Sequence, residues 1–214
     1  LPGLPHNGAL ISGGDDALQG HLLPYIDRAH QIDLAVSFLM QSGVRLILPH
    51  LQDMLARGGR LRLLTGDYLD VTEPDALRLI LDLEGARESA VFQARAIPFH
   101  PKAWMFRFED GTGALLVGSS NLSKSALTSG VEWNLRLFDR SGAAPLLEAR
   151  RAFENLLTRA EVTTLTEDWV AAYEARRAPR PVPLAGEVVE PEVPPPAPHP
   201  VQTEALAALT ATRA

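Results

Sequence analysis

The middle of the chain carries polar residues at a spacing suited to chemistry on a phosphate ester. His100 and Lys102 stand two residues apart, and the tetrapeptide Gly-Ser-Ser-Asn begins at Gly118, eighteen residues after the histidine. An imidazole can act as a nucleophile or carry a proton, and an ammonium can hold a negatively charged oxygen. The serine and asparagine side chains can donate further hydrogen bonds to the same anion, and Gly118 allows a close approach of the backbone.

Both lysines of the chain lie in this region. The sequence has eighteen arginines but only two lysines, Lys102 and Lys124. Lysine presents a compact point charge with three rotatable donors, whereas arginine presents a rigid planar fork. A site that places one ammonium against one phosphate oxygen cannot exchange the two residue types freely. The scarcity of lysine therefore favours a functional role for Lys102.

Two strands are expected around the histidine. The apolar and aromatic content of residues 91–96 and 103–108 predicts strands. His100 and Lys102 stand two residues apart at the start of the second strand, so their side chains are expected on the same side.

A hairpin is expected to return the chain to the histidine. Residues 109–113, Glu-Asp-Gly-Thr-Gly, predict a hairpin turn, and residues 114–117 predict the returning strand. This strand would deliver Gly118 and the residues after it to the level of His100. A further strand predicted at residues 131–135 would bring Glu132 to the same end of the sheet.

Each motif also has an ordinary structural explanation. A histidine on a strand commonly makes an unexceptional hydrogen bond, and Gly-Ser-Ser-Asn is commonly a turn. Residues 121–124 could also be an ordinary helix start, with Asn121 as the N-cap. The agreement of spacing with lysine scarcity favours a site over these alternatives. Trp104 and Trp133 are predicted to be core residues rather than walls of that site.

In this order the residues resemble the signature of the phospholipase D superfamily, His-x-Lys followed by Gly-Ser-x-Asn. Glu132 matches the acidic residue that the nuclease branch of this superfamily carries after the second motif. The aspartate of the full pattern is absent because Arg107 occupies its position, and Asp110 is out of register. The resemblance covers roughly residues 8–138 and is carried by His100, Lys102, Gly118, Ser119, Asn121 and Glu132.

The resemblance implies a phosphodiesterase that works through a covalent phosphohistidine and needs no metal. His100 would be the nucleophile, and Glu132 would orient its imidazole. The implied catalytic residues are His100, Lys102, Asn121 and Glu132. The implied substrate-binding residues are Ser119, Ser120, Lys124 and Ser37.

One His-x-Lys motif supplies a single histidine, and the reaction also needs a general acid. The family meets this need by pairing two motifs around a twofold axis, so we expect a homodimer. DNA is the expected substrate.

Composition limits the alternatives. Hydrophobic residues make up 46% of the chain, which suits a globular core, and the absence of cysteine excludes disulfides and a thiolate metal site. We find no apolar run of membrane-spanning length and no leader pattern, and we predict a cytoplasmic protein. The net charge of −6 argues against tight nonspecific binding of DNA by this module alone.

Strand and helix patterns alternate along the chain. This alternation predicts an α/β fold in which a mixed sheet is flanked by helices on both faces. The predicted strands before the motif are residues 33–39 and 60–65. The predicted helices are residues 18–26, 43–56, 74–83, 145–160 and 167–177.

The composition changes after Arg177. Residues 1–177 are predicted to form the phospholipase D-like domain, and residues 178–200 hold nine of the seventeen prolines and predict an extended linker. Residues 201–214 resemble the segment ahead of the ATP-binding loop in superfamily 2 helicases, where a glutamine, here Gln202, precedes a helix. Three stretches also look like bacterial DEAD/DEAH-type helicases with an N-terminal phospholipase D-like domain, namely residues 11–14, 37–39 and 64–68.

Three classes of function stay open from the sequence. The first is a DNA phosphodiesterase or endonuclease attached to a helicase, with ATP and Mg²⁺ expected only for the helicase part. The second is a catalytically weak or inactive DNA-binding or dimerisation module, which the missing aspartate and the acidic charge favour. The third is a lipid phosphodiesterase, which the single motif and the helicase-like tail disfavour.

Overall fold

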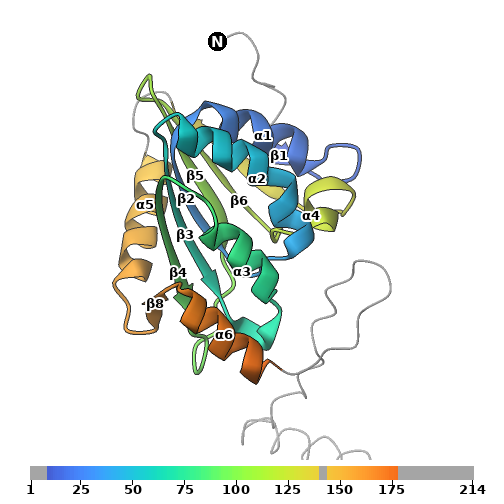
Figure 1. The fold of residues 1–214 in the computed structure, drawn as a ribbon. Coiled ribbons are helices and arrows are strands. Elements are labelled where there is room, and N and C mark those ends of the chain that lie inside the picture. Colours follow the sequence, from blue (N-terminus) through green and yellow to red (C-terminus); the bar gives the residue numbers. More distant parts are fainter. Residues whose placement is uncertain (1–8, 140–143, 178–214) are drawn as a thin grey trace, which may run out of the picture. The chain divides into compact units, whose positions relative to one another are not determined.

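A computed structural model describes residues 9–139 and 144–177. These residues form one mixed sheet with the strand order β1-β7-β6-β5-β2-β3-β4-β8, and helices cover both of its faces (Figure 1). The predicted α/β fold is confirmed. The strands are β1 (Leu10–Ile11), β2 (Ala29–Val36), β3 (Arg60–Gly66), β4 (Ala86–Phe92), β5 (Lys102–Phe108), β6 (Gly113–Gly118), β7 (Asn134–Asp139) and β8 (Val162–Thr164).

The strand directions follow from the connections. β2, β3 and β4 are parallel to one another and are joined by helices, as parallel strands require. β5, β6 and β7 form an antiparallel meander, and β5 pairs antiparallel with β2. A tight turn joins β5 to β6, whereas the longer segment 119–133, which contains a short helix, joins β6 to β7. The helices are α1 (Leu18–Arg28), α2 (Gln41–Ala56), α3 (Pro74–Leu81), α4 (Lys124–Thr128), α5 (Ala144–Leu157) and α6 (Glu167–Arg176), with a 3-10 turn η1 (Tyr68–Asp70).

The core lies in two layers, one on each face of the sheet. α1, α2, α3 and α6 pack on one face, and α5 packs on the other (Figure 1). The alternation of β5 illustrates the arrangement, since Trp104 and Phe106 belong to the larger core while Met105 lies under α5 with Phe153. Burial of both faces explains why β2 reads as an apolar run.

Two predicted strands were displaced from their true positions. β4 begins at Ala86 rather than at residue 91, and the polar residues Arg87 and Glu88 hid its start from a pattern based on apolar content. β7 begins at Asn134, so the predicted strand at residues 131–135 was wrong over its first half.

The remaining predictions differ from the structure in detail. The ends of the other helices and strands lie within a few residues of the predicted ones. β1 and β8 were not predicted, because strands of two or three residues are too short to show an alternation of apolar and polar side chains. The predicted linker, residues 178–200, and the predicted helicase-like segment, residues 201–214, lie outside the described residues.

Two glycines at the same position of two helices make a matched test of the packing. Gly20 and Gly43 are each the third residue of their helix, α1 and α2. A Cβ at Gly43 would lie 2.3 Å from the carbonyl oxygen of Leu122, whereas a Cβ at Gly20 would meet nothing within 4 Å. The loop that carries the Gly-Ser-Ser-Asn motif therefore packs directly on α2.

We expect Gly43→Ala to lower the free energy of unfolding by about 1–3 kcal/mol, because backbone atoms must move to admit the methyl group. Gly20→Ala should raise it by about 0.5–1 kcal/mol, the usual gain for alanine over glycine in a helix. Urea denaturation followed by circular dichroism measures both. Equal effects of the two substitutions would contradict the close packing of the motif loop on α2.

Candidate active site

The sheet register brings the predicted residues to one edge. Val36, the last residue of β2, pairs with Lys102, the first of β5, and Gly118, the last of β6, pairs with Asn134, the first of β7. Since these neighbours run antiparallel, the end of β2, the start of β5, the end of β6 and the start of β7 all meet there. His100 lies two residues before Lys102 at this edge, as predicted.

His100 and Lys102 are in direct contact. The Lys102 Nζ lies 2.8 Å from Nδ1 and 3.2 Å from Nε2 of the His100 ring, and 3.3 Å from the His100 carbonyl oxygen. Which ring nitrogen takes part in this bond, and in which role, depends on the tautomer of the imidazole. Lys102 is 8% exposed while His100 is exposed, so the ammonium approaches the imidazole from the protein side.

The backbone around the histidine is anchored on both sides. Ser37 donates from its backbone N and from Oγ to the Pro101 carbonyl oxygen, at 2.9 and 3.0 Å. Phe99 is buried and stacks on Phe92 with ring centroids 4.9 Å apart. Ser37 was predicted to bind substrate, but it is fully buried and its hydroxyl holds Pro101, so the structure gives it a positioning role.

Two aromatic residues that the sequence did not single out flank the histidine. The His100 ring lies edge-on to Phe38 at 5.5 Å and to Tyr68 at 6.3 Å between centroids, and these two rings stack on each other at 6.4 Å. Lys102 Nζ lies over the Phe38 ring at 5.8 Å, a cation–π contact that compensates part of its desolvation. Their positions in the sequence could have indicated this, since Phe38 and Tyr68 closely follow two parallel strands whose ends meet at the same edge of the sheet.

The Gly-Ser-Ser-Asn loop is tied to the segment that carries Glu132. The hydroxyl of Ser119 donates to the Glu132 carboxylate, and its Oγ accepts from the Trp133 backbone N at 3.1 Å. Gly118 is needed for this closeness, because a Cβ there would lie 2.2 Å from the Trp133 carbonyl oxygen. The close backbone approach that was predicted at Gly118 is therefore made by the Trp133 backbone.

Glu132 is also held from the N-terminal side. Gly13 has a φ of +73°, and a Cβ there would lie 2.5 Å from the Glu132 backbone N, so only glycine fits. The Gly14 backbone N donates to the Gly130 carbonyl oxygen at 3.0 Å. The structure therefore places Glu132 at the site edge bonded to Ser119, and its predicted role of orienting His100 stays a prediction.

The other residues of the motif loop have distinct surroundings. Ser120 is buried and accepts from Asn134 Nδ2 at 2.9 Å, so it supports the loop. Asn121 Oδ1 is buried without a hydrogen-bond partner among the described residues. Buried polar atoms are rarely left unpaired, so this oxygen is a candidate to meet a ligand or water at the site.

The alternative in which Asn121 caps a helix is wrong, because α4 begins only at Lys124. Ser123, not Asn121, caps α4, since its Oγ accepts from the Ala126 backbone N at 3.2 Å. Asn121 is thus not the helix cap. Lys124 is the first residue of α4 and is exposed, and its backbone N donates to Ser42 Oγ at 3.3 Å.

The two tryptophans of this region differ in burial. Trp104 is 4% exposed and belongs to the core, as predicted. Trp133 is 65% exposed, so its prediction as a core residue was wrong. The tryptophan precedes β7 and continues a row of exposed apolar side chains along the sheet, which we call the apolar stripe: Leu10, Val117, Trp133, Leu135 and Leu137.

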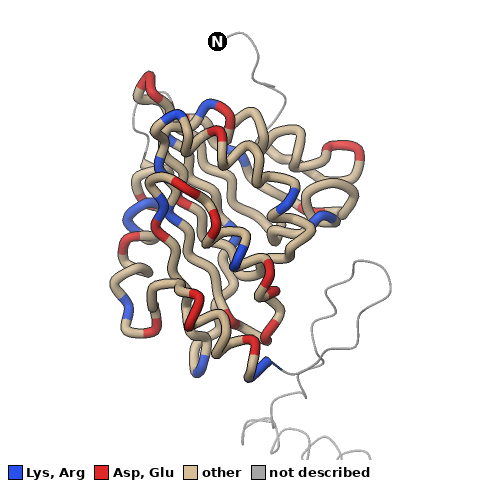
Figure 2. The backbone as a smooth tube through the Cα atoms, viewed as in Figure 1, with Lys and Arg blue, Asp and Glu red and all other residues tan. Residues whose placement is uncertain are grey.

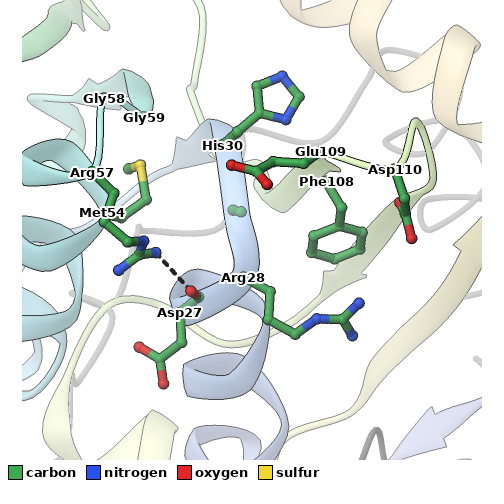
Figure 3. Close-up of a pocket in the computed structure, with 11 residues that line it drawn as sticks. Asp27, Arg28, His30, Met54, Arg57, Gly58, Gly59, Phe108, Glu109 and Asp110 are labelled. Carbon is green, nitrogen blue, oxygen red and sulfur yellow. Dashed lines mark hydrogen bonds between the residues drawn. The ribbon is translucent and has the colours of Figure 1, made fainter. Parts of the chain in front are cut away.

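A cavity of about 760 Å³ lies at the opposite end of β2 and β5 (Figure 3). It is lined by residues that include Asp27, Arg57, Phe108 and Asp110, and Arg57 donates to the Asp27 carbonyl oxygen at 2.6 Å. Asp110 bonds to Thr112 in the hairpin turn, far along β5 from the start of that strand. It therefore does not replace the aspartate that the motif lacks.

The described residues hold neither a cluster suited to a metal ion nor a helix suited to crossing a membrane. Within residues 9–139 and 144–177, no group of three or more histidine, aspartate or glutamate side chains is arranged to hold a metal ion. The helices of the same ranges include none that is long and apolar enough to span a membrane. Basic and acidic residues are interspersed along the described chain (Figure 2).

Solved structures show the same fold. NucT from Helicobacter pylori is 17% identical with a TM-score of 0.52, over 68% of this chain and 89% of that one. Nuc from Salmonella typhimurium, a phospholipase D family member, is 17% identical with a TM-score of 0.52, over 67% and 87%. Phosphatidylserine synthase from Haemophilus influenzae is 15% identical with a TM-score of 0.53, over 73% and 39%.

The sequence itself matches one family. No curated protein matches it, but the family model described as "Cardiolipin synthase, PLD-like domain" matches residues 22–157. This segment contains His100, Lys102, the Gly-Ser-Ser-Asn loop and Glu132. Because the match spans more than half of the sequence, the chain belongs to the phospholipase D-like family.

Proposed function

We propose that this domain hydrolyses phosphodiester bonds in DNA, with His100 as the nucleophile and without a metal ion. The observation that carries the proposal is the contact between His100 and Lys102 at the sheet edge that also holds Ser119, Asn121 and Glu132. A neutral imidazole has one ring nitrogen with a free lone pair, and such a lone pair is what an attack on phosphorus requires.

The reaction would proceed in two displacements. A ring nitrogen of His100 forms a bond to phosphorus while the bond from phosphorus to the leaving oxygen breaks, and that oxygen takes a proton from a general acid. Water then attacks the phosphohistidine, gives its proton to the same group, and releases His100. Covalent catalysis of this kind replaces one difficult step with two easier ones.

The neighbouring groups would stabilise the charge that develops on phosphorus. The Lys102 ammonium can transfer its hydrogen bond from the imidazole to a nonbridging phosphate oxygen, since both acceptors would lie within its reach. Asn121 lies on the loop at the same edge and can donate to another oxygen, and Ser119 can do so when its hydroxyl turns away from Glu132. Glu132 would orient the imidazole or, through Ser119, the substrate.

The second histidine would come from another copy of the chain. We propose a C2 dimer in which His100 of the partner subunit acts first as general acid and then as general base. The apolar stripe supports this arrangement, because its five exposed side chains extend from the site edge and would be buried by a partner. A twofold interface places the same stripe on both subunits.

DNA is preferred over a lipid as substrate because Glu132 matches the nuclease branch. The fold alone does not decide, since a phosphatidylserine synthase shares it. The alternative of an inactive DNA-binding or dimerisation module is favoured by Arg107, which replaces the motif aspartate and is exposed on β5. Metal-independent cleavage of DNA by the isolated domain separates these possibilities.

We also propose that the domain is attached to a helicase and acts in the cytoplasm. The support is the resemblance of Gln202 and the residues after it to the start of a superfamily 2 helicase domain. ATP and Mg²⁺ would serve that helicase part.

The first prediction concerns the nucleophile. His100→Ala should reduce cleavage of DNA and of a simple phosphodiester by about four orders of magnitude or more, the scale seen when other hydrolases lose their nucleophile. Both assays are run in EDTA, with folding checked by circular dichroism. His50→Ala, a control in which the removed ring bonds to Asp27 on α1, should retain activity. Unchanged activity of His100→Ala would remove this residue from the mechanism.

The second prediction concerns the lysine. Lys102→Arg should lower kcat by about 10²–10³, the cost of losing one well-placed donor to a developing anion, although the charge is kept. Lys102→Met removes the charge at similar length and should be equally impaired. Steady-state kinetics on a simple phosphodiester give both values. If arginine restored most of the activity that methionine loses, charge alone would suffice and the argument from geometry would fail.

The third prediction concerns assembly. Light scattering should give twice the chain mass of 23.2 kDa, and Leu135→Glu in the apolar stripe should give monomers without activity. Gln52→Glu adds the same charge on α2, across the sheet, and should remain dimeric and active.

Mixed dimers provide the second arm of that experiment. Wild type co-refolded with an equal amount of His100→Ala should keep well below half of the activity of wild type alone. About half of the dimers are then mixed and carry only one His100 instead of two. A monomer that cleaves DNA would rule out the shared site.

A further inference from the structure

The segment after β3 is strained. Leu69 has a φ of +57° and Asp70 a φ of +52°, so two consecutive residues other than glycine adopt the left-handed conformation. Side chains with a Cβ avoid this region, and it persists only where surrounding contacts impose it. Phe92 and Ser37 hold the two ends of this segment through Asp67 and Thr72. The side-chain contact to the strained pair itself comes from Arg177, directly after the last described helix.

α6 holds this segment through three side chains. Tyr173 is buried and donates from its hydroxyl to the Thr72 carbonyl oxygen at 2.9 Å, and burial raises the pKa of this hydroxyl, so it remains a donor. Arg177, which follows α6, donates from Nε to the Asp70 carbonyl oxygen at 2.8 Å. Arg176 pairs with the Asp67 carboxylate. Figure 1 shows α6 beside the segment that follows β3.

The clamped segment presents one side chain to the candidate nucleophile. Tyr68 lies between Asp67 and the strained pair, and its ring stands at 84° to the His100 ring with centroids 6.3 Å apart. The same ring stacks on Phe38, which meets the imidazole at 77°. Two parallel aromatic rings therefore both lie roughly perpendicular to the imidazole plane.

This geometry matters because His100 is exposed, so Lys102 and the two aromatic rings are what limit the orientations open to its imidazole. Phe38 is buried, whereas Tyr68 is partly exposed and is held by its stacking on Phe38 and by the segment that carries it. A nucleophile must be aligned within a fraction of an ångström to react, so restricting the imidazole rotation raises the fraction of productive encounters.

We propose that Tyr68 is a positioning residue for His100, and that α6 sets its position by clamping the strained segment 67–72. The role in catalysis rests on the proposed function, in which His100 attacks phosphorus. The placement of the imidazole by Tyr68 and α6 does not depend on that function. A substitution or movement in α6 would thereby alter the orientation of the His100 imidazole, although α6 does not contact His100.

The test measures ring orientation and kinetics in the same variants. Tyr68→Ala should lower kcat about 10- to 100-fold with little change in KM, because the substrate contacts are intact while the nucleophile is misaligned. Tyr68→Phe keeps the ring and should retain most of kcat. NMR of the histidine side chains, with the His100 signals assigned by their loss in His100→Ala, should show a shifted and broadened imidazole in Tyr68→Ala only.

The clamp is tested on α6 with a matched control. Arg177→Ala removes the bond to Asp70 and should reproduce the kinetic and NMR changes of Tyr68→Ala. Arg78→Ala breaks ion pairs with Glu167 and Glu174 on the same helix without touching the strained segment, and should leave the His100 signals unchanged.

The outcomes separate the two proposals. If wild type cleaves no phosphodiester, the proposed function fails, while the NMR comparison still decides the positioning role. If His100 signals are the same in wild type, Tyr68→Ala and Arg177→Ala, the positioning role is wrong whatever the activity. Equal loss of kcat in Tyr68→Phe and Tyr68→Ala would also overturn it, since the hydroxyl rather than the ring would then be needed.

Discussion

The contact between the Lys102 ammonium and the His100 imidazole is the interaction on which the site depends. It requires a largely buried cation, which is costly unless neighbouring groups compensate it. The His100 ring, the His100 carbonyl and the face of Phe38 supply compensation. A phosphate would supply more, so the environment that tolerates this lysine is also one that attracts the proposed substrate.

The rest of the edge can be understood as support for that pair. The fully buried Ser37 holds the Pro101 carbonyl between the two residues, and Phe99 anchors the backbone before them. On the far side, Ser119 and Glu132 bond to each other, which leaves the motif loop and the start of β7 as one unit. Polar side chains of the motif therefore make hydrogen bonds that hold the site together, besides those that they would make to a ligand.

The domain also has features that a self-contained hydrolase would not require. An apolar stripe runs from the site edge along β7, and a strained segment beside the nucleophile is held by the helix that ends the described chain. The first feature is the surface that the proposed dimer would bury. The second would connect the proposed nucleophile to Arg177 and α6, which do not contact it directly.

The sequence by itself determined the α/β fold, the motif residues and their common edge, because strand period and hairpin spacing are local properties that His100, Lys102 and Gly118 carry directly. Tertiary structure alone decided the roles of the other residues. Ser37 became a buried support, Trp133 became exposed, and Phe38 and Tyr68 became neighbours of His100, because burial and ring contacts depend on which distant segments fold against each residue. No periodicity in a single chain contains that information.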